Sequence, residues 1–356
     1  GNVSAPNCDL LIRPGVTELD WEHRTISITD AFSADTLGAP SGFGANDSTR
    51  ALDHLSVWHL DKGSGRWSAW GVGAPRIFRK ITALEPGQHY LIASDAELTW
   101  DFPDSPLVSV LEAAQVISYY GHPGVAAMGM LGAGTPEQAA DGIAELASRY
   151  DRLNGNRDVI PALLLITGVA QSQPGADGLH HTRMPDEQVS TWVDLAHERE
   201  QLIFLDVQIG LANPLEEVRA LEAFLRKPHV HLALDPEFAT HGRGKPGISI
   251  GSLDSATIDE VQNYLAEIVR EDFLPPKLLV LHQFLDRMLP GSEGGYANHP
   301  EVEIVIDMDG YGSPHAKLTK YHRYSLGGYA ERSAIKLFFR WDAPLLSPAD
   351  LQSLAN

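Results

Sequence analysis

The stretch His229-Val-His-Leu-Ala-Leu-Asp235-Pro-Glu237-Phe238 decides the predicted fold. Its apolar run is typical of a short buried strand, and the run stops at two carboxylates. Residues two apart in a strand lie on one face, so Asp235 and Glu237 should project together, with His231 below them. Pro236 has no N–H to donate, so regular pairing should end there. An apolar strand that ends in acids suits a parallel α/β barrel, whose chemistry lies at the carboxyl ends of its strands.

The same pattern recurs elsewhere in the chain, as Leu-Ile-Phe-Leu-Asp206-Val-Gln208, Leu-Leu-Val-Leu-His282-Gln283 and Ile-Val-Ile-Asp307-Met-Asp309. Seven strands are predicted in all, at residues 116–122 (with the loop), 159–167, 202–208, 229–237, 277–284, 302–309 and 334–342. Helices are predicted between several of them, at residues 135–154, 186–199, 214–225 and 254–273, with a short last helix capped by Ser347. Alternating strands and helices imply parallel pairing. The predicted fold is α/β, a TIM-like (β/α) barrel of seven or eight strands.

Composition limits the possible partners of the chain. Its 356 residues include 27 basic and 47 acidic side chains, a net charge of −20. This balance argues against a nucleic-acid or anionic-membrane surface, which needs clustered Lys and Arg. Cys8 is the only cysteine, so neither an intrachain disulfide nor a cysteine metal site can form. The sequence has no apolar run of 18 residues, and no membrane span is expected.

Residues 1–105 differ from the rest and predict a separate small antiparallel β domain, followed by a barrel domain over 106–356. Five of the seven tryptophans lie in this first part, among short β-type runs and many turn residues. Residues 57–70 are typical of two strands joined by a glycine-containing turn, and residues 81–92 and 96–100 predict two more. Residues 101–106 contain two prolines and predict a linker.

The order Trp-x-x-Asp, Gly-x-Trp, Ile-x-x-Leu-Glu-Pro-Gly-x-x-Tyr-Leu-Ile and Leu-Thr-Trp, over about residues 50–102, resembles a β module of secreted and cell-surface bacterial proteins. The resemblance implies an exported accessory module with no catalytic residue. Residues 116–350 resemble a family of secreted bacterial barrel proteins without an assigned activity, through Leu-Asp-x-Gln, Leu-Asp-Pro-Glu, His-Gln-Phe and Asp-x-Asp-Gly. Four tryptophans of the first part could either stack on sugar rings or fill its small core. They are Trp58, Trp67, Trp70 and Trp100.

Period-2 parity predicts which side chains face the inside of the barrel. Polar residues share a face at the ends of several strands: Asp206 with Gln208; His231 with Asp235 and Glu237; Asp307 with Asp309; and Lys336 with Arg340 and Asp342. His282 joins them from the fifth strand, and either Tyr119 or Tyr120 from the first. Gathering carboxylates at one rim costs several kcal/mol for each unpaired charge. Crowding should also raise the pKa of at least one of them.

Two carboxyls with separate protonation states are what glycoside cleavage needs. Glu237 is predicted to be the proton donor, at a position that resembles the acid/base site of barrel glycosidases, although Pro236 replaces their usual asparagine. Asp307 or Asp309 is the predicted partner, with Asp206 third, and Glu237 should lie within about 12 Å of one of them. A polysaccharide or cell-wall glycan is the predicted substrate, and no cofactor is expected. The predicted substrate-binding residues are Asp235, Gln208, His282, Tyr119, Tyr120, Tyr311, Lys336 and Arg340.

Two other functions use the same residues. A metal-dependent hydrolase, either a deacetylase or a phosphodiesterase, would bind its ion through Asp206, Asp235, His282 and Asp307. The sequence has no dense histidine–acid motif, however, and no metal ligand is assigned. A glycan-binding surface protein without catalysis is the third possibility. Individual acids could also serve only to pair with Lys336 or Arg340.

Overall fold

The structure is a computed structural model that describes residues 10–12, 14–21, 26–32, 37, 52–61, 65–71, 79–85, 88–100, 109–155, 157–272 and 274–354. The chain divides into two compact units, residues 1–106 and 107–356. Cys8 and the predicted linker at 101–106 lie outside the described residues.

The smaller unit is a mainly antiparallel β structure. Its five-stranded sheet has the order β2 (Gly15–Trp21), β8 (Gln88–Ser94), β4 (Leu55–Asp61), β5 (Arg66–Gly71), β6 (Arg79–Lys80). Two short sheets pair β1 (Leu10–Ile12) with β9 (Leu98–Trp100) and β3 (Ile26–Ser27) with β7 (Ala83–Leu84), and α1 covers Ile28–Ala31.

The core of the smaller unit is centred on Trp100, which is 1% exposed, stacks on Phe32 at 4.5 Å and donates from Nε1 to the carbonyl of Ala31. Trp70 packs against this core, whereas Trp67 is 38% exposed. Filling the core is therefore the role of Trp100.

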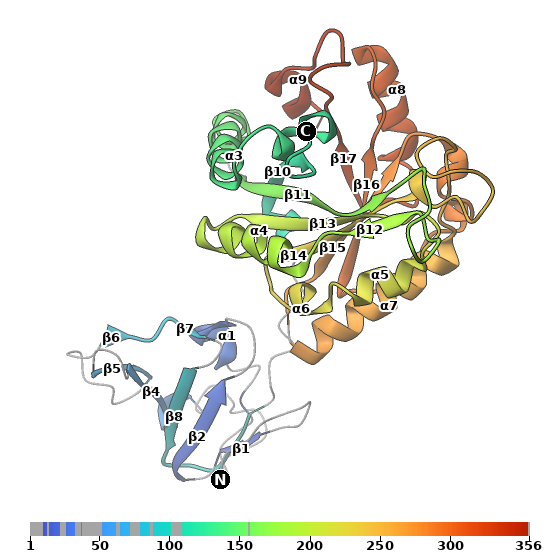
Figure 1. Ribbon diagram of the computed structural model, residues 1–356. Helices are drawn as coiled ribbons and strands as arrows, with labels where there is room; N and C mark the ends of the chain where they lie inside the picture. The colour runs from blue at the N-terminus through green and yellow to red at the C-terminus, as the bar shows by residue number, and fades with distance from the viewer. Residues whose placement is uncertain are drawn as a thin grey trace. The chain divides into compact units, whose positions relative to one another are not determined.

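The larger unit is built on a curled parallel sheet of seven strands, shown in Figure 1. The apolar runs identified in the sequence form these strands. Their order is β10 (Ala114–Gly121), β11 (Asp158–Ala170), β13 (Leu202–Gln208), β14 (Val230–Asp235), β15 (Lys277–Gln283), β16 (Val302–Met308) and β17 (Arg332–Ile335). The short strand β12 (His181–Arg183) pairs antiparallel with the end of β11.

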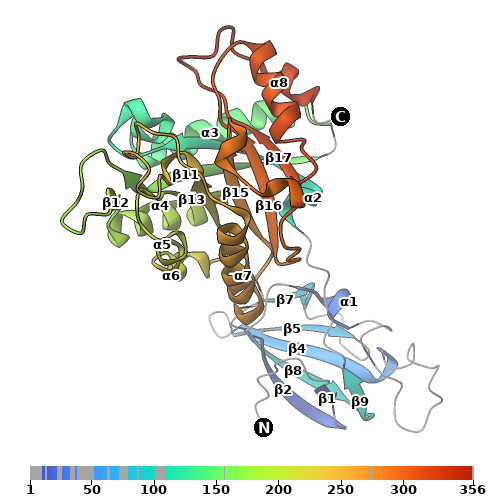
Figure 2. The same ribbon diagram turned by 90° about the vertical axis from the view of Figure 1, so that its right-hand side faces the viewer.

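Helices lie along the outside of this sheet (Figures 1 and 2). Most begin at a side-chain cap; Thr135, for example, forms a capping box with Gln138 at the start of α3. The main helices are α3 (Pro136–Asp151), α4 (Asp186–Glu198), α5 (Pro214–Arg219), α6 (Glu222–Leu225), α7 (Ser255–Asp272), α8 (Pro314–Tyr324) and α9 (Pro348–Gln352). Short 3₁₀ turns follow several strands, at Ala126–Met128, Met130–Gly132, Pro236–Phe238, Asp286–Met288 and Ser292–Gly294.

The sheet is buried on both faces, but by different means. Its outer face packs on the helices in the large core that includes Leu163, Leu205 and Leu279. Its inner face holds a smaller core around Phe204 and Val280, and α2 (Val110–Ala113) packs on that core. Because inner-facing side chains alternate with outer-facing ones, the polar residues at the strand ends continue the inner face.

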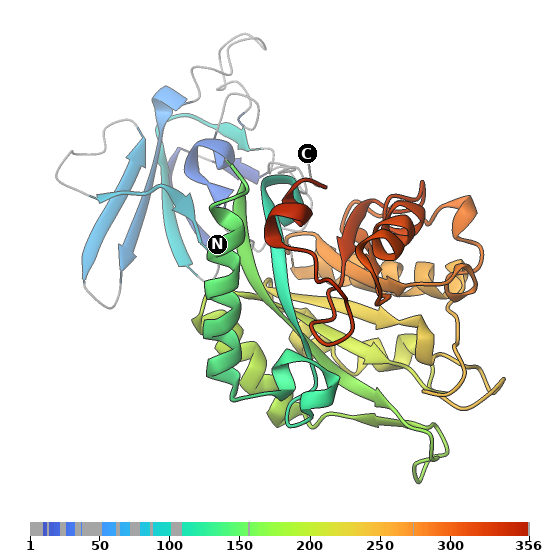
Figure 3. The same ribbon diagram turned by 90° about the horizontal axis from the view of Figure 1, so that it is seen from above.

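The sheet curls like a barrel but does not close. Among the described residues, no ladder joins β10 to β17; side chains connect the two sides instead. Ser109, the cap of α2, donates to Glu303 on β16, and Glu303 also accepts from Arg332 on β17. In place of an eighth strand, the chain continues to α9, where Gln352 donates to Gln115 of β10 (Figure 3).

The prediction of the seventh strand was wrong at its end. β17 stops at Ile335 rather than Asp342, and residues 338–342 form a turn in which the Asp342 N–H donates to the carbonyl of Phe338. The cause is the buried Asp342 carboxylate, which accepts from the Phe338 N–H and lies 3.1 Å from the Lys317 Nζ. This pairing draws the chain back toward α8 instead of letting it extend.

Candidate functional site

A cluster of ionisable side chains occupies the carboxyl edge of strands β13 to β16. The ladder sets their spacing, because it places His282 of β15 directly beside Asp307 of β16 and Asp235 of β14 beside Gln208 of β13. Asp206 is fully buried within the same sheet. Neighbouring parallel strands lie about 4.8 Å apart, so these side chains share one small volume.

His282 lies at the centre of the cluster. Its Nδ1 is 3.0 Å from an oxygen of Asp307 and 3.2 Å from one of Asp309, and its Nε2 is 3.7 Å from Asp206. Burial lowers the pKa of His282, but the three carboxylates reverse this effect and hold the pKa well above its ordinary value. His282 is therefore a cation, and its Nδ1–H donates to the carboxylate of Asp307.

Lys336 is the second cation of the cluster. It follows β17, and its N–H donates to the carbonyl of Met308, which places the side chain beside the end of β16. Its Nζ lies 2.9 Å from Asp309 and 3.5 Å from the ring centre of Tyr120. Burial raises the pKa of Asp309, but Lys336 and His282 outweigh burial, and that pKa ends below its ordinary value. Asp309 is consequently ionised.

The surroundings of Asp235 and Glu237 raise the pKa of each carboxyl, whereas those of Asp309 lower its pKa. Burial, reinforced by the charges of Asp206 and Asp309, raises the pKa of Asp235 to about 8. Burial and the charge of Asp309 also raise the pKa of Glu237, which is only half-buried. Asp235 accepts a hydrogen bond from the Glu237 N–H and so fixes the turn that carries Glu237. The edge thus combines two carboxyls whose pKa is raised with one whose pKa is lowered.

Asp206 forms an ion pair with His282, but no described residue donates a hydrogen bond to its carboxylate within the hydrogen-bond distance limit. It is 0% exposed, and neither of its carboxylate oxygens has a hydrogen-bond partner among the described residues. The His282 Nε2 at 3.7 Å is too far for a hydrogen bond. The contact between these two buried side chains is therefore an ion pair without a direct hydrogen bond.

Of the two tyrosines considered, Tyr120 faces the cluster. Its ring centre is 6.0 Å from that of His282, and its hydroxyl bonds to Gln208. Tyr119 points to the other face, where it packs on α3 near Gly142. Gln208 also accepts from the Ala170 N–H.

Three other predicted residues form no hydrogen bond or ion pair with the acids among the described contacts. Arg340 is exposed on the turn after β17, because the strand ends before it. His231 is buried in the sheet and accepts from the Leu278 N–H. Tyr311 is 67% exposed and touches aromatic residues rather than the carboxylates.

Sequence reasoning missed some of the surroundings of the site. Neither Phe338 nor Trp341, whose ring centres lie 5.7 Å apart, was assigned to the site. The ion pair of Lys317 with Asp342 was not foreseen either, because Lys317 belongs to a helix that was not predicted. The Ser313-Pro314 start of α8 was the available signal.

The cluster also has the donor set of a metal site. One atom each of His282, Asp307 and Asp309 lie within 4.8 Å of one another. Oxygen and imidazole ligands suit zinc and similar divalent ions. The same atoms are already engaged, however, because His282 donates to Asp307 and Lys336 donates to Asp309. An ion bound by these atoms would have to displace Lys336 and take the place of the proton on His282.

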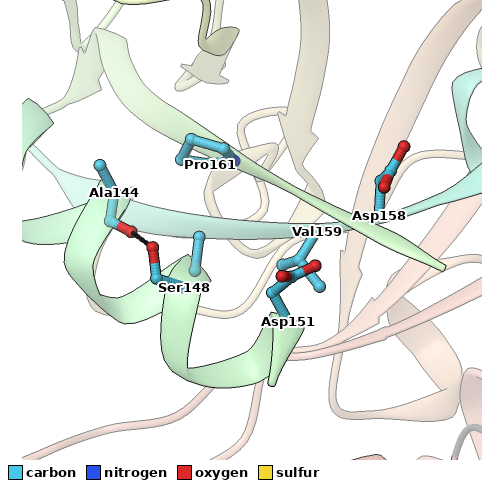
Figure 4. A pocket seen from close by; sticks show the side chains of 7 residues that line it. Ala144, Ser148, Asp151, Asp158, Val159 and Pro161 are labelled. Carbon is cyan, nitrogen blue, oxygen red and sulfur yellow. Dashed lines mark hydrogen bonds between the residues drawn. The ribbon is translucent and has the colours of Figure 1, made fainter. Parts of the chain in front are cut away.

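A pocket at the opposite edge of the sheet is separate from this cluster. It has a volume of about 370 Å³ and lies between the end of α3 and the start of β11 (Figure 4). Asp151 and Asp158 are its only ionisable side chains, and Ser148 in its wall donates to the Ala144 carbonyl. Because Asp158 begins β11, the pocket is a full strand length away from the carboxyl edge.

Comparisons with family models and with curated proteins find no match to this chain. Within the described part of the chain, no helix has the length and apolar character needed to cross a bilayer. The function is therefore argued from the carboxyl-edge cluster itself.

Proposed function

We propose that the protein is a glycoside hydrolase in which Glu237 donates the proton and Asp309 is the anionic partner. One observation carries the proposal: at one edge of a curled parallel sheet, the pKa of a half-buried carboxyl is raised in part by the charge of a carboxylate that two cations keep ionised. In many active sites, two ionisable groups have environments that shift their pKa values in opposite directions. The group with the raised pKa then acts as the acid, and the other remains ionised. Asp309 is preferred to Asp307 because its charge acts on Glu237.

The other predicted residues have supporting roles. His282 and Lys336 hold Asp309 ionised, and the buried Asp206 helps to keep the pKa of His282 raised. Asp235 fixes the turn of Glu237. We infer a barrel-type scaffold of the TIM class from the inward face and the carboxyl-edge location of these groups. The resemblance of the first unit to exported β modules supports a secreted or cell-surface protein that acts on a polysaccharide or cell-wall glycan.

The test is a hydrolysis screen on soluble polysaccharides and cell-wall glycans, with release of reducing sugar as the readout. Glu237→Gln should lower turnover by about 10²-fold or more, since a general acid contributes that much. Glu260→Gln, on the outside of α7, is the matched control and should leave turnover unchanged. Binding without turnover, unaffected by Glu237→Gln, would instead indicate a glycan-binding protein.

A metal-dependent hydrolase is the second candidate, favoured by the three ligand atoms of His282, Asp307 and Asp309. It predicts that the purified protein contains a divalent ion and that a chelator abolishes its activity. The glycosidase predicts activity that a chelator leaves intact. Running the screen with and without chelator therefore separates the two mechanisms.

A further inference from the structure

We propose that Tyr311, Phe338 and Trp341 form an aromatic platform that binds a sugar unit next to the acids. The proposal rests on the proposed glycoside hydrolase and specifies its substrate as a chain of pyranose rings with equatorial substituents. Such rings present flat C–H faces, which pack on aromatic rings.

The platform is built from two segments that follow neighbouring strands. Tyr311 follows β16, and Phe338 and Trp341 follow β17. Ring centres lie 5.7 Å apart for Tyr311 with Trp341, 5.7 Å for Phe338 with Trp341, and 6.0 Å for Tyr311 with Phe338. In the same order, the rings are inclined to one another by 50°, 35° and 71°, so the three residues form one contiguous aromatic cluster, with Phe338 the more buried member.

The platform is open and yet firmly held. Tyr311 is 67% exposed and Trp341 is 56% exposed. Beneath them, the carboxylate of Asp342 accepts from the backbone N–H groups of Gly312 and Phe338, which joins the two segments. Holding large aromatic rings in water forgoes the free energy of burying them, and contiguous exposed apolar surface of this kind commonly marks a binding site. A fixed platform also loses little conformational entropy when it binds.

Lys336 connects the platform to the acids. Its Nζ lies 5.4 Å from the ring centre of Phe338 and 2.9 Å from Asp309. One extended sugar chain can thus lie on the platform and continue to Glu237 and Asp309. This continuity favours a glycan over a protein partner or a second copy of this chain, because neither of these would need the carboxylates.

The test is calorimetric binding of two hexasaccharides, of β-1,4-linked glucose and of β-1,4-linked N-acetylglucosamine, to the full chain carrying Glu237→Gln. Trp341→Ala in that background should weaken binding at least 10-fold, and Trp341→Phe should retain most of it. Ile248→Ala removes an apolar side chain that is 73% exposed and serves as the matched control, with unchanged affinity.

Binding that Trp341→Ala leaves unchanged, or no binding of either sugar, would overturn the platform. An effect of Trp341→Ala only on the oligomeric state in sedimentation would also overturn it, since the surface would then join two copies of the chain. A different outcome would contradict the proposed hydrolase but not the platform. In that outcome the wild-type protein binds these sugars through Trp341 but releases no reducing ends.

Discussion

Lys336 is the residue on which the protonation states of the site depend most directly. Its charge lowers the pKa of Asp309 through a contact of 2.9 Å and also opposes the rise at Glu237. A neutral side chain at this position would therefore raise the pKa of both carboxyls. Loss of a neighbouring opposite charge typically changes a carboxyl pKa by 1–3 units.

We therefore expect Lys336→Met to move the basic limb of the pH–activity profile, which reports the loss of the Glu237 proton, toward higher pH. The limb that reports the ionisation of Asp309 lies below the assayed range, because the pKa of Asp309 is lowered. Turnover measured from pH 3 to 9 checks the shift. Lys227→Met, which removes a lysine paired with Asp194 elsewhere, should leave the profile in place. A shift toward lower pH would contradict the assignment.

Asp235 permits a test of stability rather than activity. Its pKa is about 8 in the folded chain and about 3.9 when unfolded, so between these values the folded state binds more protons. Its contribution to stability must therefore fall as the pH rises from about 4 to 8.

Asp235→Asn keeps the acceptor for the Glu237 N–H but cannot ionise. We expect the variant to gain stability relative to wild type as the pH rises, by about 1–3 kcal/mol between pH 5 and 8. Urea unfolding at both pH values measures the difference. If the two proteins lose stability in parallel, Asp235 is not protonated in the folded state.

At the scale of elements, the turn after β17 depends on one buried ion pair. Asp342 accepts from two backbone N–H groups and faces Lys317, which is 1% exposed. Removing one partner of a buried pair leaves an uncompensated charge and costs about 3–5 kcal/mol. Surface pairs cost about 1 kcal/mol or less.

Asp342→Ala should accordingly lower the free energy of unfolding by about 3–5 kcal/mol, as measured by urea denaturation. Asp286→Ala is the matched control, because Asp286 pairs with Arg323 on the surface and should cost about 1 kcal/mol or less. Equal losses in the two variants would show that burial of the Lys317 pair contributes little.

The sequence predicted most strands well because each is an apolar run that ends at polar residues. It failed after β17, where Leu337, Phe338 and Phe339 continue the apolar run although the chain turns. It also missed α8, whose buried side chains are Lys317, Tyr321 and Tyr324 rather than the aliphatic residues that mark an amphipathic helix. Apolar patterns record burial, and they cannot show which buried ion pair will redirect the chain.

The site was predictable to a similar extent. Strand parity brought Asp206, Asp235, His282 and the acids of β16 to one edge, because side-chain direction alternates strictly along a strand. Parity could not show that Lys336 pairs with Asp309 rather than with Asp307. Which carboxylate pairs with Lys336 depends on how far side chains extend between neighbouring strands. The sequence of one strand does not contain that information.

For the whole molecule, each of the two compact units has its own core. The smaller unit is packed around Trp100, and the larger one has its core on both faces of the sheet. All residues of the proposed site belong to residues 107–356. We expect this segment, expressed alone, to fold with a single cooperative transition and to keep the turnover of the full chain on soluble substrates. Calorimetry and reducing-sugar assays check this, and an aggregated or inactive segment would show that the first unit is required.

The unclosed side of the curled sheet also affects how the protein behaves in concentrated solution. At β10 and β17, side chains replace the ladder that closes a complete barrel, so some backbone donors and acceptors there have no neighbouring strand within the described parts of the chain. Exposed strand edges are templates on which another polypeptide can add a strand. We therefore expect the segment that ends in α9, attached to β10 through Gln352, to hinder intermolecular β-pairing at that edge.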